Sequence, residues 1–102
     1  MLKTHYCGEL NLKSKGKEVV LAGWVHSRRD HGQLIFIDLR DSTGIAQLVI
    51  TSKIKEGQKL NPEFVIQVKG KINERPAGMK NAKIPTGEIE VEATELKILS
   101  KS

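Results

Sequence analysis

The sequence contains a single cysteine, Cys7, so no disulfide can form within the chain, and the disulfide framework of a small secreted scaffold is excluded. Aromatic residues are also scarce, with one Trp, one Tyr and two Phe in 102 residues. Asp, Glu or Lys interrupts every hydrophobic stretch, so none is long enough to span a membrane. The first five residues, MLKTH, lack the apolar segment of a signal peptide. We therefore expect a cytoplasmic protein with no membrane partner.

The motifs that carry catalysis or bind metals are absent as well. His5 and Cys7 form one potential ligand pair, but a zinc site needs a second pair at a matching spacing. Neither His26 nor His31 is patterned with a serine or cysteine nucleophile, and the sequence has no glycine-rich phosphate-binding loop. We expect no catalytic residue, no metal, no cofactor and no enzymatic activity for this chain alone.

The length and the charge balance favour one small domain with an acidic partner. A chain of 102 residues that is 38% hydrophobic can build a single compact core. The formal net charge of +5 makes nucleic acid the first candidate partner. Late in the chain, however, a row of carboxylates would repel a uniform polyanion, although one of them could read a base edge. The row consists of Glu88, Glu90, Glu92 and Glu95.

One stretch, residues 28–41, organises the rest of the chain. It reads RRDHGQLIFIDLRD, and a turn is predicted at Gly32 because glycine takes positive φ at little cost. A strand is predicted over 33–39, with Ile35, Ile37 and Leu39 on one face and Leu34, Phe36 and Asp38 on the other. An aromatic residue on the more polar face, just after two arginines, suits stacking on an unpaired base. The alternative is a half-buried Phe in a two-sided strand.

Alternating apolar residues predict four further strands, over 18–29, 45–51, 64–72 and from Gly87 onward. Gly23, inside the first strand, predicts a bend or a bulge. In the last strand the apolar phase changes near Thr94-Glu95, which predicts another bulge.

Two short helical segments are expected outside the strands. Ser52 can cap a segment that Gly57 and Pro62 limit to one or two turns. One helical turn is expected around 8–12, and Asp41 is expected to hydrogen-bond the backbone of the turn at 41–44.

Five strands, with a helical segment only between the third and the fourth, are the order of an OB-fold, a Greek-key barrel. Closure of the barrel removes the edges that five short strands would otherwise expose. An open antiparallel sheet and an SH3-like barrel are the alternatives. We expect one all-β domain over 1–102, with an N-terminal arm over 1–16, the barrel over 17–99 and the start of a linker over 100–102.

A candidate binding surface is predicted on the face opposite the core. Its members are Arg28 and Arg29 at the end of the first strand, Phe36, Gln47 and Glu90 at outward positions of three strands, and Arg75 after the fourth strand. The first three strands of an OB barrel form its usual oligonucleotide face. An aromatic ring, an amide, a carboxylate and guanidinium groups together suit single-stranded RNA. The alternative is that each is an ordinary strand or loop residue, so the prediction depends on their convergence.

Five motifs along the chain carry a family resemblance. They are THYCGEL at 4–10, GWV at 23–25, RRDHG at 28–32, LIFIDLRD at 34–41 and TGEIEV at 86–91. In this order they resemble the N-terminal domain of bacterial aspartyl-tRNA synthetases, and the resemblance extends from Thr4 to Ser102. That family domain is an OB barrel that binds the tRNA anticodon loop, so the resemblance implies tRNA as the partner.

The resemblance also implies roles for individual residues. Phe36 matches the aromatic residue that stacks on an anticodon base. Gln47 and Glu90 match polar residues that read base edges, and Arg29 and Arg75 match arginines around the anticodon pocket.

His31 lies in the loop that approaches the third anticodon base in this family, and a histidine there resembles enzymes that accept both aspartate and asparagine tRNAs. The chain also departs from the family pattern. Ser27, Asn61 and Asn73 stand where many members have arginine, and the segment between the third and fourth strands is shorter. Fewer cations in contact with phosphate imply weaker binding and a shallower salt dependence.

The full-length family enzyme is several times longer, with a class II catalytic domain that also forms most of its dimer contact. The resemblance therefore implies that this chain alone binds the anticodon stem-loop without aminoacylating it. It implies a monomer for the isolated domain and a homodimer for the full-length family. The alternative is an OB-fold scaffold, as an isolated, reconstructed or engineered domain, with little RNA binding of its own.

Overall fold

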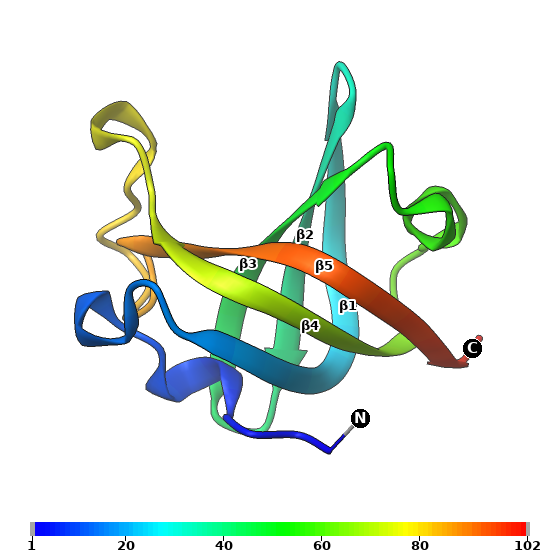
Figure 1. Cartoon of the computed structure of the whole chain (residues 1–102), viewed down its shortest axis with the longest axis horizontal. Helices are drawn as coiled ribbons and strands as arrows, with labels where there is room; N and C mark the ends of the chain where they lie inside the picture. Colours follow the sequence, from blue (N-terminus) through cyan, green and yellow to red (C-terminus); the bar gives the residue numbers. More distant parts are fainter. Residues whose placement is uncertain (1, 102) are drawn as a thin grey trace.

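The computed structural model describes residues 2–101, and across this range five β-strands close into a barrel (Figure 1). They are β1 (Glu18–His31), β2 (Leu34–Asp41), β3 (Gly44–Thr51), β4 (Val65–Glu74) and β5 (Ile89–Ser100). Their order is β1-β2-β3-β5-β4, and β1 pairs with β4 to close the barrel. The prediction of a five-stranded OB-fold barrel is therefore confirmed, and the open sheet is excluded. The two end positions of the predicted domain, 1 and 102, lie outside the described residues.

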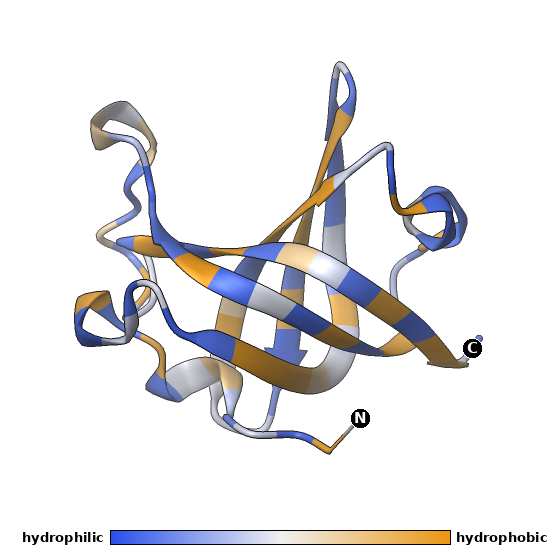
Figure 2. Ribbon diagram, viewed as in Figure 1, coloured by the Kyte–Doolittle hydropathy of each residue, from blue (hydrophilic) through white to orange (hydrophobic). Residues whose placement is uncertain are grey.

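The core follows from the alternation of apolar residues along each strand. Figure 2 shows hydrophobic and hydrophilic positions alternating along β4 and β5. The predicted inner faces of β2 and β3 are confirmed, because their side chains are at most 3% exposed: Ile35, Ile37, Leu39, Ala46, Leu48 and Ile50. Since the apolar side chains of these strands fill the barrel, the opposite faces of β2 and β3 carry the residues of the predicted surface.

The segment before β1 packs onto the barrel. It forms two 3-10 turns, η1 (Cys7–Glu9) and η2 (Leu12–Ser14), and not the single turn predicted over 8–12. The side chains of Cys7 and Leu10 are buried in the core. The Asp41 carboxylate accepts hydrogen bonds from the backbone N–H of Thr43 and, at 2.7 Å, from that of Cys7. Asp41 thus serves the β2–β3 turn as predicted, and it also anchors the N-terminal segment.

β1 pairs with two strands because it bends in the middle. Residues 18–24 pair with β4, and residues 24–31 pair with β2. Gly23 lies where the two pairings meet, and a Cβ atom there would collide with the carbonyl oxygen of Arg40. The absence of a side chain at Gly23 therefore allows the two strands to approach closely.

A β-bulge interrupts β1 just after this bend. Val25 pairs with Leu39, but the next pair along β2 joins Ser27 with Asp38, so His26 is the additional residue. The bend predicted from the sequence is present, and the bulge lies three residues after the glycine that suggested it.

The second predicted bulge is confirmed in β5. Lys69 of β4 pairs with Glu95, whereas its neighbour Gly70 pairs with Ala93. Thr94 is therefore the additional residue, at the position where the apolar phase of the sequence changes.

The segment between β3 and β4 contains the short 3-10 helix η3 (Lys55–Lys59). The prediction that Ser52 caps it is wrong, because η3 begins after Ile54. Packing determines the position of this segment: Gly57 is buried so closely against Ile50 that a Cβ atom would lie 2.7 Å from Cγ2 of Ile50.

Replacement of Asp41 by Ala should lower the free energy of unfolding by about 2–3 kcal/mol, because the partly buried N–H of Cys7 loses a charged acceptor. Urea denaturation followed by the fluorescence of Trp24 measures the change. Ser42→Ala, at an exposed position of the same turn, is the control and should shift the unfolding free energy by less than about 0.5 kcal/mol. Equal effects of the two substitutions would contradict the anchoring role of Asp41.

Candidate nucleic-acid interface

The bulge at His26 decides which side chains of β1 face outward. Val25 points into the core, and at a period of two residues Ser27 and Arg29 would point inward after it. The additional residue reverses this phase. Arg29 consequently pairs across from Phe36, and the two side chains lie on the outer face of the barrel.

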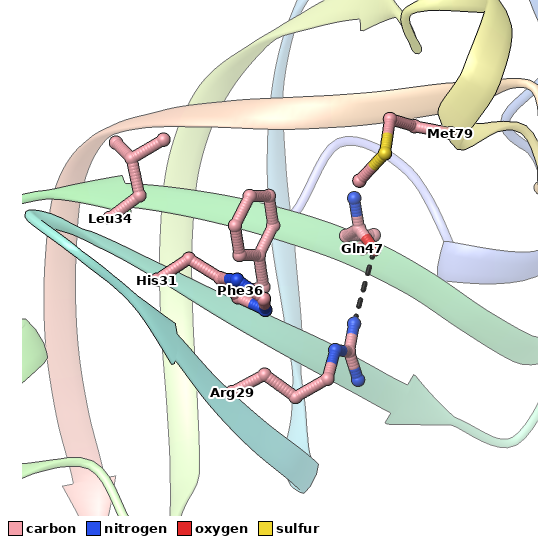
Figure 3. A pocket seen from close by; sticks show the side chains of 6 residues that line it. All are labelled: Arg29, His31, Leu34, Phe36, Gln47 and Met79. Atoms are coloured by element: carbon pink, nitrogen blue, oxygen red, sulfur yellow. Dashed lines mark hydrogen bonds between the residues drawn. The ribbon is translucent and has the colours of Figure 1, made fainter.

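Six side chains on this face line a hollow of about 260 Å³ (Figure 3). They are Arg29, His31, Leu34, Phe36, Gln47 and Met79. The rings of His31 and Phe36 pack edge to face with their centroids 5.4 Å apart. Figure 3 shows the Phe36 ring between Leu34 and Met79, with Arg29 and Gln47 joined by a hydrogen bond beside it. The hollow therefore offers an oriented aromatic ring next to polar groups, which suits a flat and partly polar ligand.

A chain of hydrogen bonds runs from β1 to β5 beneath the hollow. Ser27 Oγ donates to Asp38 Oδ2 at 2.8 Å, and Arg29 Nη1 donates to the same oxygen at 2.9 Å. Arg29 Nη2 donates to Gln47 Oε1 at 3.2 Å, and Gln47 Nε2 donates to Glu90 Oε1 at 3.5 Å. Gln47 is only 6% exposed, so its amide is held in one orientation by a charged group at each end.

Arg75 lies next to this chain and is the most buried cation of the predicted set, at 5% exposed. Its Nε donates to the carbonyl oxygen of Ile89 at 2.8 Å, but its buried Nη2 has no hydrogen-bond partner within residues 2–101. Burial lowers the pKa of Arg75, while the carboxylates of Glu90 and Asp38 act in the opposite direction. A buried donor without a partner is unfavourable, and Arg75 is not among the residues that line the hollow.

The two carboxylates of the site have opposite pKa shifts. Burial raises the pKa of Asp38, but the hydrogen bonds from Arg29 and Ser27 and the nearby charges of Arg29 and Arg75 outweigh it, so the pKa lies below 3.8. For Glu90 burial dominates over the charge of Arg75 and raises the pKa above 4.5. Glu90 is therefore the more readily protonated acceptor of the site.

Arg28 lies apart from the other predicted residues. It pairs with Ile37, whose side chain points into the core, so Arg28 is on the opposite side of β1 from Arg29. Its Nη1 donates to the carbonyl oxygen of Leu60 at 2.8 Å, and its Nε donates to Asp30 at 2.8 Å. The structure thus gives Arg28 a role in holding the β1–β2 hairpin against the segment around η3. It brings together the other six predicted residues: Arg29, His31, Phe36, Gln47, Arg75 and Glu90.

The sequence analysis did not assign four residues of this surface. Asp38 and Leu34 are in phase with Phe36, so period-two alternation had already placed them on its face. Ser27 was treated only as a missing arginine, although it donates to Asp38. No pattern in the sequence indicated Met79. It reaches the hollow from the connection between β4 and β5, where it is the last residue of the 3-10 turn η4 (Ala77–Met79).

Within residues 2–101, no group of three or more His, Cys, Asp or Glu side chains is placed to hold a metal ion. The same part of the chain has no helix that is long and apolar enough to cross a membrane. The groups that the surface does present are an aromatic ring, hydrogen-bond donors and hydrogen-bond acceptors, which are the components of a binding site.

Comparison with known proteins agrees with the motifs. Residues 19–99 match the family model described as OB-fold nucleic acid binding domain, of the tRNA anticodon type. The chain is 54% identical over 105 residues to the aspartate–tRNA(Asp/Asn) ligase of Methylacidiphilum infernorum, which covers 98% of the chain and 18% of that ligase. The chain therefore spans less than a fifth of the length of this relative. The resemblance to aspartyl-tRNA synthetases is confirmed.

Two solved structures show the same fold. The asparaginyl-tRNA synthetase from Pyrococcus horikoshii matches with a TM-score of 0.82 and 30% identity, over 100% of this chain and 24% of that one. OBody AM2EP06, solved bound to hen egg-white lysozyme, also matches with a TM-score of 0.82, at 26% identity, over 100% of this chain and 97% of that one.

The opposite pKa shifts lead to a titration experiment. Carbon NMR of the side-chain carboxyl groups should give a midpoint below 3.8 for Asp38 and above 4.5 for Glu90. Asp38 then contributes stability that is present above pH 3.8 and is lost as the pH falls through its lowered pKa. Glu90 contributes stability that is present below pH 4.5 and is lost as the pH rises through its raised pKa.

Asp38→Asn and Glu90→Gln assign the two signals in this titration. Midpoints in the reverse order, or both at their ordinary values, would contradict the electrostatic account of the site.

Proposed function

The chain belongs to the family of OB-fold nucleic acid binding domains and is the anticodon-binding domain of aspartyl- and asparaginyl-tRNA synthetases. We propose that it binds the tRNA anticodon loop by stacking a base on Phe36. The observation that carries this proposal is the hollow in which Phe36 lies beside Arg29 and Gln47. Its residues come from β1, β2, β3 and the loop between β4 and β5, and OB barrels bind oligonucleotides with the face of strands 2 and 3 and the loops between strands 1 and 2 and between strands 4 and 5. Stacking on an aromatic ring suits an unpaired loop base, whose face is accessible.

In this proposal Gln47 reads the edge of the stacked base. Arg29 occupies one acceptor position of its amide oxygen, and Glu90 occupies one of the two N–H groups of its nitrogen. The amide therefore presents one further N–H and one further lone pair in a fixed orientation. A base edge with complementary groups would be preferred, because a mismatched edge leaves buried polar groups unpaired.

The proposal extends to the longer proteins that the chain resembles. The relative from Methylacidiphilum infernorum is named as a ligase that acts on tRNA(Asp/Asn). We infer that in a protein of this kind the present domain selects the tRNA, whereas aminoacylation depends on the remainder of the protein. We further propose a cytoplasmic location, a monomeric state for the isolated domain and a homodimer for the full-length protein.

Replacement of Phe36 by Ala should weaken binding to a stem-loop with a GUC anticodon by about 5- to 150-fold, because a stacked base contributes roughly 1–3 kcal/mol. Fluorescence anisotropy with the GUC stem-loop and with a scrambled loop measures the effect. Tyr6→Ala is the matched control, since Tyr6 is an exposed aromatic residue that contacts Lys3 and lies outside the hollow. Equal binding of the wild-type chain to both loops would contradict the proposed function, and an unchanged affinity of Phe36→Ala would exclude Phe36 as the stacking residue.

His31 leads to a prediction about the third anticodon base. If His31 confers relaxed reading, stem-loops that end the anticodon in C and in U should bind with affinities that differ by less than about tenfold, or 1.4 kcal/mol. The same anisotropy assay measures both affinities at one salt concentration. A larger preference for C would contradict relaxed reading while leaving anticodon binding itself intact.

A second candidate function is that of a protein-binding barrel. The similarity to OBody AM2EP06 favours it, because that protein has the same fold and was solved bound to hen egg-white lysozyme. Ser27 also removes a cation that the family resemblance implies at its position. Binding of neither stem-loop by the wild-type chain would support this second function over the first.

A further inference from the structure

We propose that Asp38 is a positioning residue that makes this surface selective for bases over phosphates, by holding Arg29 against Gln47 and balancing its charge. The inference rests on the proposed RNA-binding function and assigns a role to a residue that touches the hollow only through others. It is argued from three observations: the contacts of Asp38, the orientation of Gln47 and the charges of the site.

The contacts of Asp38 hold the guanidinium of Arg29 in one plane. Arg29 Nη1 lies 2.9 Å from Asp38 Oδ2, and Nη2 lies 3.3 Å from Oδ1, so the carboxylate is bound at both oxygens. Ser27 Oγ donates to Oδ2 at 2.8 Å and holds the carboxylate from the other side. The side chain of Asp38 is 22% exposed, so water weakens this ion pair less than it would at the open surface. A two-point contact of this kind restricts both the position and the plane of an arginine.

The position of Arg29 in turn sets the orientation of Gln47. The Nη2 group that Asp38 holds also donates to Gln47 Oε1 at 3.2 Å, and the amide nitrogen faces the Glu90 carboxylate at 3.5 Å. A flip of the amide would place its NH2 group against a guanidinium and its oxygen against a carboxylate, and both contacts would be repulsive. The donor and the acceptor that Gln47 presents to a base are therefore ordered through Asp38.

The charges of the site balance when Asp38 is present. The cations are Arg29 and Arg75, the anions are Asp38 and Glu90, and the sum of the four charges is zero. A neutral cluster exerts little net attraction on a phosphate, so binding depends on matched hydrogen bonds to a base. Without the Asp38 charge, the partly exposed Arg29 becomes a free cation that a phosphate of any sequence can engage.

The decisive variant is Asp38→Asn, which keeps the size of the side chain and removes its charge. Affinities for the GUC stem-loop and for the scrambled loop are measured over a range of salt concentrations. We expect the ratio of the two affinities to fall by about tenfold or more, with the scrambled loop bound at least as tightly as by the wild-type chain. The slope of log K against log salt should steepen by about 0.7, the value for one additional phosphate contact to single-stranded RNA.

Asp30→Asn is the matched control. It removes the same charge from the same hairpin and breaks the Arg28–Asp30 ion pair, but this pair lies outside the hollow. It should change both affinities by the same factor and leave their ratio as in the wild-type chain. Ser27→Ala, which removes only the hydroxyl that supports Asp38, is a milder variant and should lower the ratio by less than Asp38→Asn.

A readout without RNA tests the positioning itself. In the free protein, the two side-chain amide protons of Gln47 should give separate NMR signals that exchange slowly with water. We expect Asp38→Asn to speed this exchange and Asp30→Asn to leave it unchanged. Unchanged Gln47 signals in Asp38→Asn would overturn the proposal, whatever the affinity.

The outcomes separate the inference from the function on which it rests. Equal weakening of both loops in Asp38→Asn, with an unchanged salt slope, would show a purely structural role and overturn the inference. If Asp38→Asn and Asp30→Asn changed the affinities equally, the effect would come from the overall charge of the domain, and the inference would be overturned as well. If the wild-type chain binds both loops equally, the proposed function itself is contradicted, whatever the Asp38 variants show. There is then no selectivity to assign to Asp38.

Discussion

One additional residue in β1, the bulge at His26, is the constraint on which the rest of the surface depends. Up to Val25, apolar side chains of the strand pack into the core: Val19, Leu21 and Val25. The bulge reverses that phase, so that the second half of β1 directs Ser27 and Arg29 to the outer face, opposite Asp38 and Phe36. Without it Arg29 would lie on the core side of β1, where Arg28 lies now with its guanidinium bound to the backbone near η3. The bulge therefore brings Arg29 to the outer face and assembles the polar surface.

Closure of the barrel brings the remaining components to this surface. Gln47 lies on β3 and Glu90 on β5, strands that are separated in sequence by β4 but adjacent in the barrel. Arg75 follows the end of β4 and lies near the Glu90 carboxylate, although fifteen positions separate them in the chain. The hydrogen-bond chain from Ser27 to Glu90 consequently joins three neighbouring strands and β1 into one rigid polar layer. Such preorganisation favours selective binding, because little freedom is lost when a ligand arrives.

The face on which a side chain lies could be predicted where it depends only on the alternation of residues within one strand. Phe36 and Gln47 were assigned correctly to the outer face because each lies in a strand with unbroken alternation. The residue pattern grouped Arg28 with Arg29, since nothing local to two consecutive arginines shows on which face of the strand each one lies. Only the family resemblance singled out Arg29. The structure separates them, with Arg28 against the backbone near η3 and Arg29 in the hollow. Met79 was not assigned, because a loop residue has no periodicity from which its direction can be read.

The sequence by itself determined the class of fold, the two inner faces of β2 and β3, the β5 bulge and the family. These features are encoded in the alternation of apolar residues over short stretches and in contiguous motifs. Both can be read from the sequence without the three-dimensional structure. Only the tertiary structure decided that Arg28 lies apart from the hollow, that Asp38 joins Ser27 to Arg29, and that the Nη2 of Arg75 is buried without a partner among residues 2–101. These features depend on register between strands and on burial by distant segments. Register and burial are properties of the closed barrel as a whole, and no local stretch of the chain specifies them.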